Sequence, residues 1–219
     1  MVDTAITQII IDALEDKFTN MNFQVAAYIE LMEKIRDDGS ISLLTRCAYE
    51  RYYDMTQARL SLLWKNRYFE IFDDCLKNKE KTISFENLMK EVGPDGNCVQ
   101  FSFISKLFHT LKNEEPIYDK YIRDFLEIST PSGKKPEDRE KSAVKIYNNE
   151  IKVGFYDNCE YAELRDLMLD LFTERFPNVS GVSKNKKIDF VCWALGKKKM
   201  KISVLVDLHK KERNDLIAG

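Results

Sequence analysis

Apolar residues recur at three- and four-residue spacing along most of this chain, which is the period of an amphipathic helix. The first such face consists of Ile6, Ile9, Ile10, Ala13 and Leu14. A second helix follows a break near residue 20 and ends at the polar run 37–40. Residues 41–76 contain no Pro or Gly and are rich in aromatic residues, so we predict one long helix there, or two helices joined by a kink.

The second half of the chain continues this pattern in shorter segments. Helices are predicted directly after Pro116 and over residues 84–92, 99–111, 137–156, 161–176 and 186–195. Residues 202–208 are β-like in composition, but they fit a terminal helix equally well. The run STPSGKKP at 129–136 has the composition of a linker. The pattern therefore predicts an all-α, multi-helix globular protein.

Composition supports a folded protein and excludes several classes of site. With 44% apolar and 32% charged residues, the chain differs from a disordered one. No apolar run is long enough to span a bilayer, and residues 1–20 are acidic where a signal peptide is basic and then apolar. We therefore expect a cytoplasmic protein without a membrane partner.

The five cysteines, at positions 47, 75, 98, 159 and 192, are scattered along the chain. There is no CxxC pair and no Cys/His cluster in the sequence, which argues against a disulfide framework and a structural zinc site. We expect neither a metal nor a cofactor.

Charge is distributed unevenly. Residues 184–219 hold ten Lys or Arg against four acids, a local charge of +6, while the whole chain carries −2. Lys197, Lys198 and Lys199 form the densest part of this basic tail. Such a tail can bind phosphate, although a solvated lysine face is the commoner explanation of a charge run.

Residues 93–126 form the segment with the most chemical content: a Gly-bearing turn, a helix, a short loop and a second helix. On the first of these helices one side is lined by Phe101, Ile104, Phe108 and Leu111. The other side carries Ser102, Ser105, Lys106 and His109. After Pro116, the inward face is predicted to hold Ile117, Tyr121, Ile122 and Phe125, while Asp119, Lys120 and Arg123 project away.

Each polar residue of this segment also has a purely structural interpretation. Asp119 lies in the first turn of a helix, where an acid caps free amides and complements the helix dipole. His109 lies near a helix end, where it can bind the last carbonyls, and Lys106 is most simply a solvated lysine. A functional site requires these residues to converge on one cleft.

The order of a glycine turn, a helix and the sequence Pro116-Ile117-Tyr118-Asp119 resembles the helix–hairpin–helix DNA glycosylase superfamily. In the resemblance, Gly93-Pro94-Asp95-Gly96 corresponds to the hairpin that binds DNA phosphate, and Asp119 to the family aspartate. The run from Ser102 to His109 and the element Asp189 to Lys197 also resemble a group of bacterial proteins related to that fold.

The sequence departs from that family at defined points. Cys98 to Ser102 lacks the lysine that bifunctional members keep after the hairpin, and Asp95 places a negative charge where phosphate binds. The cysteine spacing excludes an iron–sulfur cluster.

The resemblance implies an all-α protein with a helix–hairpin–helix-like central segment. We expect a single unit over 1–219 or two lobes, with N-terminal helices at 1–80, the helix–hairpin–helix-like segment at 81–130 and C-terminal helices with the basic tail at 137–219.

It also implies double-stranded DNA as a partner, contacted by Gly93, Gly96 and Lys197–Lys199. If the chain is an enzyme, Asp119 is the expected catalytic residue for hydrolysis of an N-glycosidic bond, in a cleft with Ser102, Lys106, His109 and Tyr118. Tyr118, Tyr121 and Phe103 are candidates for stacking on an extruded base. The alternative is a non-catalytic helical module that binds a protein partner through residues 41–76.

Overall fold

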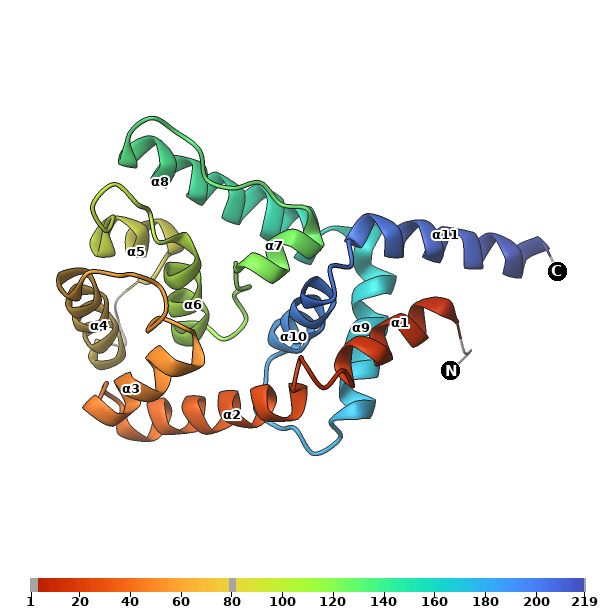
Figure 1. The fold of residues 1–219 in the computed structure, drawn as a ribbon, viewed down its shortest axis with the longest axis horizontal. Helices are drawn as coiled ribbons and strands as arrows, with labels where there is room; N and C mark the ends of the chain where they lie inside the picture. The colour runs from red at the N-terminus through yellow and green to blue at the C-terminus, as the bar shows by residue number, and fades with distance from the viewer. Residues whose placement is uncertain (1–3, 79–81, 219) are drawn as a thin grey trace.

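The computed structural model describes residues 4–78 and 82–218, and its regular elements in these ranges are all helical (Figure 1). The α-helices are α1 (Ala5–Leu14), α2 (Met21–Asp38), α3 (Leu43–Tyr52), α4 (Leu62–Lys77), α5 (Phe85–Val92), α6 (Phe101–Leu111), α7 (Lys120–Leu126), α8 (Pro136–Lys145), α9 (Ala162–Arg175), α10 (Lys184–Lys197) and α11 (Ile202–Ala218). A π-helix, η1 (Ile146–Tyr156), continues α8, and a 3₁₀ turn, η2 (Cys159–Tyr161), precedes α9. The all-α prediction is confirmed.

Two groups of helices lie side by side, and α2 runs along both (Figure 1). One group contains α3 to α6 and α8, and the other contains α1, α7, α9, α10 and α11. The first helix, α1, packs on α9, α10 and α11, which are distant from it in sequence. The backbone N–H of Ala5 donates to the Glu212 side chain at 2.8 Å, which ties α1 to α11.

Local sequence explains where several helices begin. A side-chain oxygen at the N-cap accepts a backbone N–H of the first turn and so replaces a hydrogen bond that the helix lacks. Ser42, Ser61, Ser84 and Ser183 do this for α3, α4, α5 and α10.

The segment 41–76 forms two separate helices, α3 and α4. Residues 53–61 between them are not helical, because Asp54 adopts a positive φ of 55° and Ser61 starts a new helix. Of the two alternatives predicted for residues 41–76, two helices agree better with the structure than one long helix. The connection between them is nine residues long instead of a kink. Residues 202–208 belong to the helix α11.

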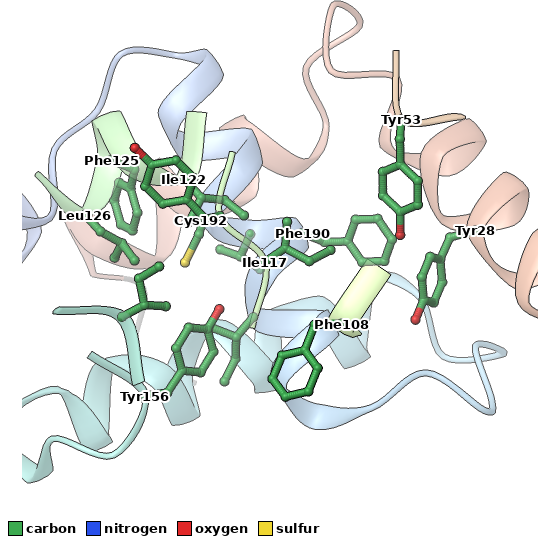
Figure 2. Packing of buried hydrophobic residues seen from close by; sticks show 14 of the residues in the cluster. Tyr28, Tyr53, Phe108, Ile117, Ile122, Phe125, Leu126, Tyr156, Phe190 and Cys192 are labelled. Atoms are coloured by element: carbon green, nitrogen blue, oxygen red, sulfur yellow. The ribbon is translucent and has the colours of Figure 1, made fainter. Parts of the chain in front are cut away.

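The core contains the two aromatic residues predicted from the central helices. Phe108 is 4% exposed and Phe125 is fully buried, as expected from the stripes on which they lie. Figure 2 shows part of this core, in which Phe125 and Leu126 of α7 lie near Cys192 of α10.

Helices α7 and α10 approach each other very closely. Gly196 of α10 faces the backbone of Tyr121 in α7, and a Cβ atom at this glycine would lie 2.0 Å from the Tyr121 carbonyl oxygen. A residue without a side chain is therefore required for this contact. The contact fixes the start of α7, and with it Asp119, against the C-terminal helices.

Candidate functional site

A cavity of about 1260 Å³ lies between the two helix groups. Its lining comes from α2, α3, the connection after α3, α6, α7 and α10. Ligand sites for small molecules usually measure about 300–1,000 Å³, so this space is large enough for a ligand with several parts. Aromatic residues supply much of its wall, including Phe23, Tyr52, Tyr53, Phe103, Tyr121 and Trp193.

Asp119 lines this cavity from the N-terminus of α7. One carboxylate oxygen, Oδ1, accepts the backbone N–H groups of Tyr121 and Ile122 at 2.8 and 2.9 Å. The other oxygen makes no hydrogen bond within residues 4–78 and 82–218. Asp119 is thus a helix cap and, at the same time, a half-buried carboxylate in the cavity wall.

Residues 117 and 118, directly before Asp119, are held by hydrogen bonds to two helices. The backbone N–H of Ile117 donates to Asp189 Oδ2 at 3.2 Å, and that of Tyr118 donates to Ser105 Oγ at 3.0 Å. The first bond connects Ile117 to α10, and the second connects Tyr118 to α6. They satisfy buried backbone donors and therefore fix where the Asp119 side chain begins.

Lys106 is half-buried and lines the same cavity, unlike the solvated lysine suggested by its position on α6. Its ammonium nitrogen lies 5.4 Å from the ring centroid of Tyr53 and 5.1 Å from that of Phe103. Burial lowers the pKa of Lys106, while the charges of Asp119 and Asp54 raise it. Asp119 and Lys106 therefore share one site.

Lys186 and Asp189 of α10 complete the charged lining of the cavity, and neither was expected at the site from the sequence pattern. Lys186 is 5% exposed, and its nitrogen lies 4.9 Å from the Tyr28 ring and 4.5 Å from the Phe190 ring. Burial lowers the pKa of Lys186, whereas the nearby charges of Asp189 and Asp119 raise it.

Asp189 is 1% exposed and is held by protein donors at both oxygens. Oδ1 accepts the Tyr156 hydroxyl, and Oδ2 accepts the backbone N–H of Ile117. Burial raises the pKa of this carboxyl, and the charge of Lys186 opposes that change. The sequence signal for this pair is a lysine and an aspartate three residues apart on the face of a strongly apolar helix.

His109 does not line the cavity, although it was predicted to share a cleft with Asp119. It is fully buried, its Nδ1 donates to the Glu115 carbonyl at 2.6 Å, and its Nε2 then accepts the Tyr28 hydroxyl at 2.9 Å. Burial, assisted by the charge of Lys186, lowers the pKa of His109 to about 3. A neutral ring with both nitrogens occupied joins α6 to α2 and to the following loop.

The two other residues predicted for the cleft differ in position. Ser102 lines the cavity beside Lys106. Tyr118 instead packs into the core, with its ring stacked 4.0 Å from the Phe101 ring and its hydroxyl donating to the Ser129 carbonyl at 3.3 Å. Of the expected stacking residues, Tyr121 and Phe103 line the cavity.

The glycine turn lies against the start of α4. Gly93 and Gly96 have φ angles of 69° and 58°, which glycine adopts readily. The Gly93 carbonyl accepts the Trp64 indole N–H at 2.9 Å, and the Asp95 carboxylate accepts both the backbone N–H and the hydroxyl of Ser61. The negative charge of Asp95 is thus directed to the N-terminus of α4.

The three lysines of the basic tail lie at and just after the end of α10. Lys197 has its nitrogen 4.6 Å from the Trp193 ring, and Trp193 lines the cavity, so Lys197 lies near the cavity rim. Lys198 forms an ion pair with Asp16 at 2.6 Å. Lys199 is exposed and adopts a positive φ of 61°.

Within the described ranges, no three His, Cys, Asp or Glu side chains gather as they would around a metal ion. No helix in those ranges has the length and apolarity to cross a bilayer. The chain matches no family model, no curated protein and no solved structure.

Proposed function

We propose that the cavity receives a nucleobase extruded from DNA and that Asp119 acts on the N-glycosidic bond of that nucleotide. One observation carries the proposal: Asp119 is fixed by two backbone amides through one oxygen while its second oxygen is free of protein partners within the described residues. A carboxylate held in this way can act without first giving up a protein contact. Its position in the wall of a large aromatic cavity suits a buried reaction centre.

In the proposed reaction the bond between sugar C1′ and the base nitrogen breaks, and its electron pair leaves with the base. The sugar passes through an oxocarbenium-like state, whose positive charge the Asp119 carboxylate stabilises. Water then forms the new bond to C1′, and its proton passes to Asp119 and on to the departing base or to solvent. The products are a free base and an abasic site.

The aromatic wall supports a flat ligand such as a base. Tyr121 and Trp193 meet edge to face, with ring centroids 5.8 Å apart and an interplanar angle of 83°. Both line the same cavity as Asp119. Stacking on aromatic side chains binds every base and repays part of the cost of removing it from the duplex.

The decisive experiment replaces Asp119 with Asn. Asn caps helices nearly as well as Asp, so Asp119→Asn should fold and melt close to the wild type or slightly above it. Abasic-site formation on DNA containing a panel of damaged bases should be lost. Asp138→Asn is the matched control, because Asp138 also accepts a backbone N–H at the start of a helix, α8, but lies outside the cavity lining. A wild-type protein inactive on every substrate, with an unchanged melt for Asp119→Asn, would show that Asp119 is only a cap.

Contact with the DNA backbone is proposed for the turn at Gly93–Gly96 and for Lys197–Lys199. Binding of duplex DNA should then weaken steeply as salt rises, because counterions are released from the phosphates. Charge reversal of the three lysines should weaken binding without unfolding the protein, as measured by fluorescence anisotropy and a thermal melt. Absence of binding at low salt would remove DNA as the partner.

A second candidate function is that of a non-catalytic module that binds a protein. It is favoured by Leu43, Leu44, Leu62 and Leu63, which are 69–82% exposed in the first turns of α3 and α4. The aromatic residues of the same region do not supply this surface, since Tyr49, Tyr68 and Phe72 are fully buried. An active wild-type protein that loses activity in Asp119→Asn would decide for the enzyme.

A further inference from the structure

Two ammonium groups face the same cavity from different helices, Lys106 from α6 and Lys186 from α10. Aromatic rings surround both of them at 4.5–5.4 Å. Within the described ranges, neither nitrogen forms an ion pair or a hydrogen bond with the protein. Two positive charges thus lie in the cavity wall without the direct partners that buried charges normally have.

Two acids of the same cavity, Asp189 and Asp119, are bound to other groups through three of their four carboxylate oxygens. Asp189 has both oxygens bound to protein donors, and Asp119 has one oxygen bound to two backbone amides. Both acids lie close enough for their charges to act on Lys186. Neither, however, is within ion-pair distance of a lysine nitrogen, so the ammonium N–H groups are left without a protein acceptor in the described part of the chain.

We infer that Lys106 and Lys186 form an anion subsite inside the cavity and that it binds a phosphate group of the ligand. Each ammonium group has three N–H donors, which an oxyanion can accept. The two lysines are near enough to repel each other electrostatically, and one dianion neutralises both at once, which favours phosphate over a carboxylate. The rest of the ligand would lie along the aromatic wall.

This inference goes beyond base excision and does not require it. A cavity of about 1260 Å³ has room for a phosphate group at the two lysines and a flat ring system beside them. The subsite is tested by equilibrium binding, whereas the proposed reaction is tested by product formation. Failure of one therefore remains distinguishable from failure of the other.

The test is a series of thermal melts in inorganic phosphate, with chloride used to hold ionic strength constant. Phosphate should raise the melting temperature along a saturating curve, because it binds the folded state. Lys106→Met and Lys186→Met should each weaken phosphate binding by about tenfold or more. Lys120→Met is the matched control, because Lys120 lines the cavity but is exposed, and it should keep the wild-type response.

A second measurement does not depend on variants that fold. An amine-reactive reagent is applied to the wild-type protein with and without phosphate, and each modified lysine is quantified by mass spectrometry. Phosphate should protect Lys106 and Lys186 and leave Lys120 unprotected. Equal protection of all three, no saturable effect of phosphate, or acetate binding as tightly as phosphate would each overturn the assignment.

Discussion

Replacement of Gly196 with Ala tests whether the contact between α7 and α10 controls the site. The added Cβ would lie 2.0 Å from the Tyr121 carbonyl oxygen and 2.6 Å from its carbonyl carbon. Ordinary van der Waals contact begins near 3.4 Å, so α7 must move by the difference of about 1.4 Å. Since the opposing atoms belong to the backbone, no side-chain rotation can relieve the overlap.

The expected loss follows from two opposing contributions. Overpacking of a well-packed contact costs about 1–3 kcal/mol, and a clash with backbone belongs at the upper end. Ala favours a helix over Gly by up to about 1 kcal/mol, which offsets part of the loss. We expect a net destabilisation of about 2 kcal/mol, or about 4–8 °C in melting temperature for a chain of this length.

Urea titration followed by circular dichroism measures this loss. Gly39→Ala is the control, because Gly39 has a φ of 58° and no atom lies within 4 Å of the place that an added Cβ would occupy. This variant should therefore lose only about 1 kcal/mol through backbone strain, without a clash. Gly196→Ala should also reduce the activity proposed for Asp119, because α7 carries that residue. A Gly196→Ala protein as stable as the wild type would refute the close contact.

Two other predictions concern stability. Phe108→Ala and Phe125→Ala should each lower the free energy of unfolding by roughly 3–5 kcal/mol in urea titrations. Leu63→Ala is the control and should change it little, because Leu63 is 82% exposed. Losses below about 1 kcal/mol at both phenylalanines would contradict their packing. The pKa of His109 is lowered from 6.5 to about 3, so the stability that its neutral ring provides is fully present above pH 6.5. That stability is lost as pH falls below 6.5, by up to about 1.4 kcal/mol per pH unit. The pKa of Asp189 is raised from 3.8 to about 7, so between these pH values its carboxyl adds stability as pH falls and opposes the loss from His109. Asp189→Asn should therefore steepen the loss of stability towards acid pH in a series of urea titrations, and an unchanged slope would contradict this opposition.

Periodicity is sufficient to predict the all-α class and most of the helices. The stripes through Phe108 and Phe125 are buried because each helix packs mainly along one face. The break between α3 and α4 was harder to predict, since residues 53–61 contain neither Pro nor Gly. A left-handed Asp54 and the cap at Ser61 end and restart the helix there, and both depend on local geometry that composition does not reveal.

The candidate site was predictable only in part. Asp119 and Lys106 lie on the segment that carries most of the sequence motifs, and both line the cavity. Lys186 could not be predicted as a residue of the site, because it lies in a basic run, where a lysine is usually solvated. Its burial arises from the packing of α10 between α2 and α7, which is a property of tertiary structure.

The position of α1 has a consequence for the order in which the protein folds. Its apolar residues Ile6, Ile10 and Leu14 are buried against α9, α10 and α11, which are synthesised after the other described helices. At ordinary rates of translation the wait between α1 and α10 is on the order of ten to forty seconds. During that time the apolar face of α1 lacks its final partners, so the half of the molecule that holds α7 in place is completed only after nearly all of the described chain has left the ribosome.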